Sequence, residues 1–258
     1  MDTSAQGLRV LVTAGAAGIG RAIARTFLDH GARVHVCDVD RAALDEARRL
    51  MPAVTQTVAD VARLDEVERL FADVRRSLGG LDVLVNNAGI AGPTAKVEDI
   101  APADWDRCIA VDLSGMFYCT RLALPLLKAA GGGSIVNLSS VAGRLGFPLR
   151  APYAAAKWGV VGFTKSLAIE AGPDGVRVNC LQPGNVEGER IDRVIDAKAQ
   201  AFGIPFEAQK RKLLETASLR TFVTAQDVAN MALFLATDAG KHISGQALSI
   251  CGDLTHTV

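Results

Sequence analysis

A tyrosine and a lysine four positions apart are the clearest chemical signal in this sequence. Tyr153 and Lys157 belong to the segment Tyr-Ala-Ala-Ala-Lys, and Ser140 precedes the tyrosine by thirteen residues. On a helix, side chains four positions apart lie on the same side, one turn from each other. A phenol is a poor base at neutral pH, but a neighbouring ammonium favours its phenolate form. The three groups could therefore exchange a proton with a substrate hydroxyl and hold a developing oxyanion.

A glycine-rich segment near the N-terminus predicts a nucleotide site. Residues 13–20 read Thr-Ala-Gly-Ala-Ala-Gly-Ile-Gly, between an apolar run and an amphipathic stretch. Such a turn lets backbone N–H groups approach a pyrophosphate at the positive end of a helix. Asp38 ends the second apolar run, where a carboxylate can bind the adenosine ribose and repel a 2′-phosphate. We therefore expect NAD rather than NADP, the alternative being that Asp38 only begins a turn.

The segments 86–89 and 185–219 also indicate specific roles. Residues 86–89, Asn-Asn-Ala-Gly, follow an apolar run and suit a tight bend that leaves room for a ribose; an ordinary polar turn is the alternative. Residues 185–219 contain no strand pattern and are rich in charge. This stretch is interpreted as a helical lid inserted after the sixth strand, and its Gly188 and Gly203 suit movement.

Apolar runs of strand length alternate with amphipathic stretches of helix length along the chain. Nearly continuous apolar runs are typical of strands buried on both faces, and their alternation with helices implies a parallel sheet with right-handed crossovers. The expected fold class is α/β: a single doubly wound Rossmann-type domain over residues 1–258, with a mostly seven-stranded parallel sheet and a helical lid at 185–219. The expected strands are 8–12, 34–37, 55–58, 83–85, 135–138, 176–181 and 247–250, and the expected helices are 19–29, 41–50, 64–78, 103–129, 153–171 and 226–236.

Composition narrows the possible functions. The 258 residues are 49% hydrophobic, and 28 basic residues balance 28 acidic ones, which argues against a nucleic-acid partner. No apolar run reaches the length of a membrane span, and the N-terminus lacks the pattern of a signal peptide. The five scattered cysteines are typical of reduced residues in a cytoplasmic protein, and the four histidines show no metal-ligand spacing. We expect no metal, no membrane and no nucleic acid.

Taken together, these motifs resemble the short-chain dehydrogenase/reductase superfamily over nearly the whole chain. The resemblance is carried by segment 13–20, Asp60, segment 86–89, Ser140, Tyr153 with Lys157, and Pro183-Gly184. It implies that Tyr153 is the general acid/base, that Lys157 assists it and holds the nicotinamide ribose, that Ser140 positions the substrate, and that the protein is a homotetramer. The cofactor-binding residues that it implies are Gly15, Ala17, Gly18, Ile19, Gly20, Asp38, Asp60, Val61, Asn87, Ala88, Gly89, Tyr153, Lys157, Pro183, Gly184 and Val186.

The chain departs from the family pattern at three places. Ala14 follows the threonine where the family usually has glycine, and an alanine is penalised at positive φ. Asp112 replaces a frequent asparagine and joins the candidate catalytic residues, because a carboxylate would favour charged Lys157; a tolerated isostere is the alternative. Residues 251–253, Cys-Gly-Asp, replace the usual aspartate followed by two glycines.

The implied activity is an NAD-dependent oxidoreductase that interconverts a secondary alcohol and a ketone with a small-molecule substrate. Arginine side chains near the pocket suit an acidic group, so a small polar or acidic hydroxy compound is expected. Solvated surface charge is the alternative for these arginines. A 3-oxoacyl-(acyl carrier protein) reductase and a non-catalytic NAD-binding regulator remain alternative functions. The candidate substrate residues are Ser140, Arg144, Arg150, Arg190 and Arg193.

Overall fold

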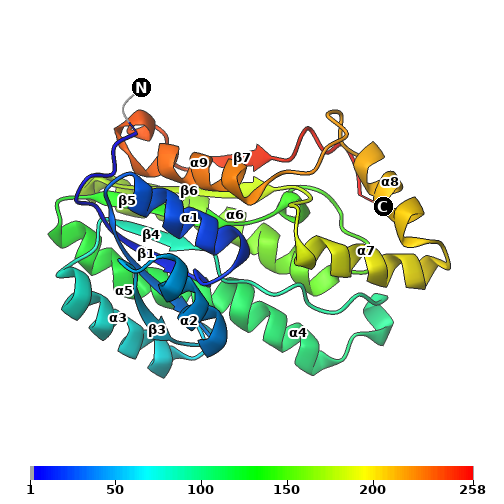
Figure 1. Ribbon diagram of the computed structural model, residues 1–258, viewed down its shortest axis with the longest axis horizontal. Helices are drawn as coiled ribbons and strands as arrows, with labels where there is room; N and C mark the ends of the chain where they lie inside the picture. The colour runs from blue at the N-terminus through cyan, green and yellow to red at the C-terminus, as the bar shows by residue number, and fades with distance from the viewer. Residues whose placement is uncertain (1–2, 258) are drawn as a thin grey trace.

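A seven-stranded parallel sheet forms the centre of the computed structural model, which describes residues 3–257 (Figure 1). The strand order is β3-β2-β1-β4-β5-β6-β7, so the direction of winding reverses between β1 and β4. In such sheets, ligands bind at the carboxyl ends of the strands beside this switch point. The strands are β1 (Arg9–Thr13), β2 (Arg33–Asp38), β3 (Thr55–Val58), β4 (Val83–Asn86), β5 (Gly133–Leu138), β6 (Val176–Pro183) and β7 (Ala247–Ile250).

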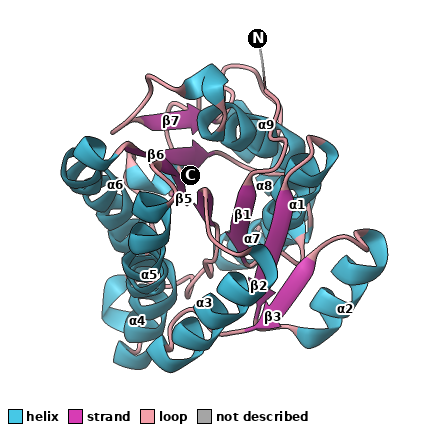
Figure 2. Ribbon diagram, turned by 90° about the vertical axis from the view of Figure 1, so that its left-hand side faces the viewer, coloured by secondary structure: helices cyan, strands magenta, loops and turns pink. Residues whose placement is uncertain are grey.

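Helices cover both faces of the sheet, as Figure 2 shows. One apolar core lies between the sheet and α1, α2 and α9, and a second lies between the sheet and α3, α5 and α6. Strands buried on both faces explain the unbroken apolar runs in the sequence. The predicted α/β doubly wound fold is thereby confirmed. The helices are α1 (Gly18–Asp29), α2 (Arg41–Leu50), α3 (Leu64–Leu78), α4 (Pro102–Ile109), α5 (Gly115–Ala129), α6 (Ala151–Ala171), α7 (Glu189–Phe202), α8 (Phe206–Glu215) and α9 (Ala225–Ala236).

The stretch expected as one helix at 103–129 contains a local change of winding. Helices α4 and α5 are joined without a break by a π-helical turn, Ala110–Ser114, which contains Asp112. Such turns insert an extra residue and are frequent at functional sites. Among the described residues, the joined helix Pro102–Ala129 is long and apolar enough to cross a membrane, by length and composition alone. Core helices of soluble proteins can have the same length and composition.

The predicted lid segment folds into α7 and α8, which extend beyond the carboxyl ends of the strands (Figure 1). Both of its ends are tied to the body of the protein. At the start, the Glu187 N–H donates to the Val223 carbonyl at 2.9 Å, and the Val223 N–H donates to Asn185 at 2.9 Å. At the end, the Thr255 N–H donates to the Thr216 carbonyl at 2.9 Å. The segment is therefore anchored at both of its ends.

A buried histidine, His35, lies within β2. The side chain of His35 on β2 is 1% exposed, and its ring nitrogens lie 2.8 Å from the Thr55 hydroxyl and 3.0 Å from the Thr57 hydroxyl. The Thr57 hydroxyl in turn donates to Asp73 at 2.7 Å. Burial lowers the pKa of His35 from 6.5 to about 4, although the negative charge of Asp73 opposes this shift.

We expect His35 to make the stability of the protein pH-dependent. A lowered pKa means that the unfolded chain binds the proton more readily, so stability is complete above pH 6.5 and falls as the pH drops towards 4. The loss should approach about 1.4 kcal/mol per pH unit and total about 3 kcal/mol. Denaturant unfolding at several pH values measures it. The His35→Gln variant should show a flatter dependence between pH 6.5 and 4, and parallel curves for the two proteins would refute the assignment.

Candidate active site

The glycine-rich segment forms the turn from β1 to α1. The structure gives a steric reason for glycine at each of the three predicted positions. A Cβ on Gly15 would lie 2.6 Å from a methyl group of Val36, and one on Gly20 would lie 2.1 Å from the Ala14 carbonyl oxygen. Gly18 has a φ of +51°, which favours glycine. Ala14 also has a positive φ, of 48°. The turn therefore holds Ala14 in a left-handed conformation that favours glycine.

We expect the Ala14→Gly variant to be more stable than the wild type. Relief of the left-handed conformation contributes about 1–2 kcal/mol, and the greater freedom of glycine in the unfolded chain offsets about half of that. Denaturant titration should show a net gain of roughly 0.5–1 kcal/mol. The matched control, Ala16→Gly, lies at a buried position without positive φ and should lose stability. A destabilised Ala14→Gly variant would show that the backbone at Ala14 is not strained.

The surroundings of this turn fit a nicotinamide dinucleotide. Helix α1 begins at Gly18, and its N-cap residue Ala17 makes no side-chain cap, so the N–H donors at the positive end of the helix suit a pyrophosphate. Asp38, half-buried at the end of β2, faces the turn, and one of its carboxylate oxygens lies 3.4 Å from the Ala16 nitrogen. Asp60 accepts from the Ala62 N–H at 3.0 Å and pairs with Arg107 at 2.9 Å, beside the buried Val61.

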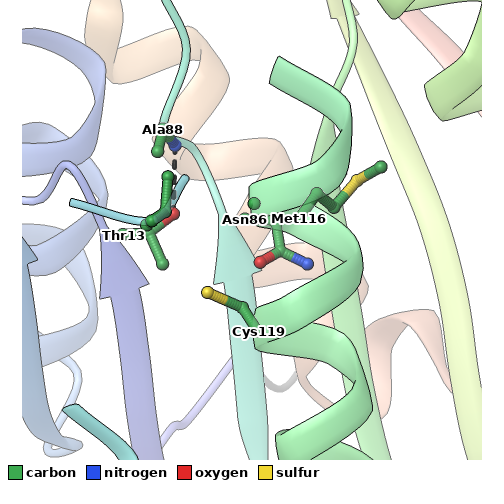
Figure 3. Close-up of a pocket in the computed structure, with 7 residues that line it drawn as sticks. Thr13, Asn86, Ala88, Met116 and Cys119 are labelled. Atoms are coloured by element: carbon green, nitrogen blue, oxygen red, sulfur yellow. Dashed lines mark hydrogen bonds between the residues drawn. The ribbon is translucent and has the colours of Figure 1, made fainter. Parts of the chain in front are cut away.

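The end of β4 is joined to the glycine-rich turn by hydrogen bonds. The Thr13 hydroxyl accepts from the N–H groups of Asn87 and Ala88, both at 3.0 Å; Figure 3 shows the second bond. The Asn87 amide donates to the carbonyls of Thr13 and Ala14, each at 3.0 Å. The space that the residues in Figure 3 surround is too small for a water molecule. The predicted Asn-Asn-Ala-Gly bend is thus a rigid wall beside the nucleotide turn.

Tyr153 and Lys157 lie on the first turns of α6, as their spacing predicts. The Lys157 side chain is nearly inaccessible; its ammonium donates to the Leu138 carbonyl at 3.0 Å and lies 5.5 Å from the centroid of the Tyr153 ring. The backbone of Gly89 passes so close that a Cβ there would lie 3.2 Å from the Lys157 nitrogen. The end of β4 and the tyrosine–lysine pair therefore form one site.

Asp112 makes the second contact of the lysine. Its side chain is fully buried, and one carboxylate oxygen lies 3.4 Å from the Lys157 nitrogen. The other oxygen accepts from the Ile90 N–H at 2.7 Å. The π-helical turn brings this side chain between α6 and the loop that follows β4. Asp112 therefore holds Lys157 and the loop together, which we class as a positioning role.

The two adjacent serines after β5 have different surroundings. The Ser139 hydroxyl donates to the Lys157 carbonyl at 2.8 Å and is tied to α6. The Ser140 hydroxyl accepts from the Ala142 N–H at 3.2 Å and so keeps its own proton for another acceptor. This geometry supports Ser140 rather than Ser139 as the substrate-positioning hydroxyl.

A cavity of about 440 Å³ opens between the loop after β4 and the lid helix α7. This volume suits a small ligand. Arg150 is 3% exposed and lines the cavity; its guanidinium donates to the Ala91 carbonyl at 3.0 Å and lies 5.0 Å from the Tyr153 ring centroid. The exposed Arg193 of α7 also lines the cavity. The remaining lining residues are Gly89, Ile90, Ala91, Gly92, Thr94, Val194 and Ala197.

Arg144, another of the predicted substrate residues, is not among the described residues that line this cavity. The exposed Arg144 donates to the Leu254 carbonyl at 2.6 Å and is thereby engaged by the C-terminal segment, outside the cavity lining. The side chain of Arg190 lies outside the described residues. The sequence did not predict that Lys198 of α7 is buried. This helix carries several other charged residues, so the pattern did not distinguish Lys198 from a surface lysine.

The predicted wall after β6 is packed against the C-terminal segment. The Gly184 N–H donates to the Ile250 carbonyl at 2.8 Å, and a Cβ on Gly184 would lie 2.8 Å from the Cβ of Cys251. Pro183 ends β6, two residues beyond the predicted strand end, and Val186 forms an isolated bridge with Val223. Close packing against Cys251 therefore explains why position 184 is a glycine.

A nucleotide turn on a doubly wound sheet, with an adjacent tyrosine–lysine pair, defines a nicotinamide-dependent oxidoreductase acting on hydroxyl or carbonyl groups. The family model described as enoyl-(acyl carrier protein) reductase matches residues 14–255. The D-beta-hydroxybutyrate dehydrogenase of Cupriavidus necator is 36% identical over 95% of this chain and 97% of its own length. The cis-4-hydroxycyclohexanecarboxylate dehydrogenase of Sinomonas cyclohexanicum is 35% identical over 95% of both chains.

Solved structures agree with these relatives. An actinorhodin polyketide ketoreductase with NADPH superposes with a TM-score of 0.92 at 32% identity, covering 98% of each chain. The chain therefore belongs to the short-chain dehydrogenase/reductase superfamily and is an alcohol dehydrogenase or ketone reductase. The predicted family and reaction class are confirmed.

Proposed function

We propose that this protein is an NAD-dependent dehydrogenase of a small hydroxy compound that carries a carboxylate. The observation that carries the proposal is Arg150, a buried cation that lines the cavity and lies 5.0 Å from the Tyr153 ring centroid. Its Nε and Nη2 both donate to the Ala91 carbonyl, which fixes the guanidinium, and a guanidinium has five N–H donors, so Arg150 would orient an acidic substrate in addition to this contact. The names of both relatives given above describe hydroxy acids, which supports the same substrate class.

In the proposed reaction a secondary alcohol becomes a ketone, or the reverse. The nicotinamide, when bound, supplies the hydride acceptor. Tyr153 exchanges the proton with the substrate hydroxyl, and the Lys157 ammonium lies 5.5 Å from the centroid of its ring. Ser140 donates to the substrate oxygen, and Asp112 with the Leu138 carbonyl keeps Lys157 in place. The segment 185–219 is proposed to close over the cavity and exclude water.

A panel of substrates tests the proposal through NADH formation. We expect turnover with D- or L-3-hydroxybutyrate, or with cis- or trans-4-hydroxycyclohexanecarboxylate. The matched neutral alcohols, 2-butanol and cyclohexanol, should give a much lower kcat/KM because they leave Arg150 without an anion. Equal turnover of acids and neutral alcohols would refute the acidic substrate class. A preference for acyl carrier protein thioesters would instead favour the second candidate, a 3-oxoacyl reductase, which the description of the matching family model supports.

We expect Asp38 to decide the choice of cofactor. A carboxylate at the end of β2, facing the nucleotide turn, would bind the ribose hydroxyls of NAD and repel the 2′-phosphate of NADP. The wild type should prefer NAD in kcat/KM. The Asp38→Ala variant should narrow that preference by about tenfold, mainly through a higher KM for NAD, because ribose hydrogen bonds and charge repulsion are both lost. A wild-type preference for NADP would refute the role.

The assembly and location are proposed on the same basis. Large apolar side chains remain exposed on α5 and α6, with Phe117 at 46% and Trp158 at 51% exposure. Exposed apolar surface of this kind is typical of subunit interfaces, which supports the homotetramer implied by the family resemblance. Light scattering tests it, since a mass near 27.1 kDa would mean a monomer. We also propose a cytoplasmic location, because the five cysteines are scattered along the chain and all buried, as is typical of reduced residues.

A further inference from the structure

The C-terminal segment, residues 251–257, contacts two parts of the site that are far apart in the sequence. The first is the serine turn, residues 140–146, which lies just after β5. The Arg144 guanidinium donates to the Leu254 carbonyl at 2.6 Å, and the Thr257 hydroxyl donates to the last carbonyl of the turn at 2.6 Å. Leu254 is 3% exposed and belongs to an apolar cluster with side chains of the same turn. The segment is therefore fixed to the serine turn by polar and apolar contacts.

The second part is the lid end, residues 216–219, which directly follows α8. The Thr255 N–H and hydroxyl both donate to the Thr216 carbonyl, at 2.9 and 3.1 Å. The Ser218 N–H donates to the Asp253 carbonyl at 3.1 Å, and the Ser218 hydroxyl donates to the Asp253 carboxylate. One short segment therefore bridges the lid end and the serine turn.

The three residues that depart from the family pattern open this segment. The Cys251 sulfur accepts from the Leu254 N–H at 3.3 Å and from the Arg144 guanidinium at 3.5 Å. Gly252 and Asp253 both have positive φ, of 61° and 57°, and successive residues of this kind bend the backbone sharply. The bend lets Asp253 contact the lid end while Leu254 contacts the serine turn. The departure from the family pattern therefore falls within the bridge.

The serine turn determines where the Ser140 hydroxyl lies. Its oxygen accepts from the Ala142 N–H at 3.2 Å, and the Ser140 carbonyl accepts from the Gly143 N–H at 2.8 Å. The lid end continues from α8, which packs against α7, the helix that lines the cavity. A shift in either place can therefore be passed to the other through the C-terminal segment.

We propose that Arg144 is a positioning residue that couples the placement of the Ser140 hydroxyl to the position of the lid, through the C-terminal segment. This rests on the proposed function, in which Ser140 donates to the substrate oxygen and the segment 185–219 closes over the cavity. Arg144 then acts on Ser140 and not on the substrate itself. Because such a coupling is reciprocal, weakening the bridge on either side loosens both parts.

Hydrogen–deuterium exchange of the protein without substrate or cofactor, followed by mass spectrometry, tests the coupling. The Arg144→Met variant keeps most of the side-chain length but cannot donate to the Leu254 carbonyl. We expect exchange to become about tenfold faster in peptides from the serine turn and also in peptides from the lid end, since a hydrogen bond from a charged group is lost. The Arg144→Lys variant, which keeps a cationic donor, should restore most of the protection.

The Ser218→Ala variant weakens the same bridge from the lid side, at an exposed position. Loss of the hydroxyl bond to Asp253 should also speed exchange in the serine turn, although Ser218 does not belong to it. The exposed Arg48 on α2 provides the matched control, and Arg48→Met should exchange as the wild type does in both parts.

The proposal is overturned if Arg144→Met speeds exchange only in the serine turn, or in neither part, because Arg144 would then make a local contact alone. Equal effects of Arg144→Lys and Arg144→Met would overturn it as well. If Arg144→Met does not fold, an unchanged serine turn in Ser218→Ala overturns it. Because exchange is measured without substrate, the coupling can fail while the proposed dehydrogenase activity stands, and the substrate panel can fail while the coupling stands.

Discussion

The Tyr153→Phe variant should lose nearly all turnover while it retains NADH binding. The phenol oxygen is the only part of the side chain that is removed, so the ring contacts with Arg150 and Lys157 remain. General acid–base catalysis contributes about 10²–10⁴-fold, and kcat should fall by that range. Steady-state turnover measures kcat, and fluorescence titration of NADH measures the cofactor site independently.

The chain offers a close control for this experiment, because it contains two tyrosines. Tyr118 lies half-buried on α5, and its ring packs 5.8 Å from that of Phe117, measured between centroids. The Tyr118→Phe variant should keep wild-type kcat. A Tyr153→Phe variant that kept more than about a tenth of wild-type kcat would assign the proton transfer to another group.

The Asp112→Ala variant should lose both stability and activity. The substitution leaves the buried Lys157 ammonium without its carboxylate and the Ile90 N–H without its acceptor. Removal of one partner from a buried ion pair typically costs about 3–5 kcal/mol. We expect a loss of unfolding free energy in that range, measured by denaturant titration, and a lower kcat because Lys157 and the loop after β4 are no longer held together.

The Asp112→Asn variant separates the hydrogen bond from the charge. An asparagine oxygen can still accept from the Ile90 N–H, but its amide nitrogen would face the Lys157 ammonium. This variant should be destabilised less than Asp112→Ala and should keep measurable turnover. If Asp112→Ala lost less than about 1 kcal/mol, or if both variants lost the same amount, the carboxylate would have no special role in holding the site.

The sequence determined the fold class because the patterns that define its strands and helices involve residues close together in the chain. Apolar runs buried on both faces, separated by helical patterns, require a parallel sheet covered by helices. The glycine-rich turn and the Tyr153–Lys157 spacing are local as well, so they could be predicted from neighbouring residues alone. Even so, local pattern could not show that α4 and α5 are joined by a π-helical turn, because that turn is held by contacts with distant segments.

Only the tertiary structure decided which charged residues share the site. Arg144 and Arg150 are six positions apart and indistinguishable in type, yet the fold ties one to the C-terminal segment and buries the other against Tyr153. Lys198 gave no signal in the sequence, because its burial depends on the packing of the lid against Phe147. A sequence specifies residue types and spacing along the chain, whereas the electrostatics of a pocket depend on which distant segments the fold brings together.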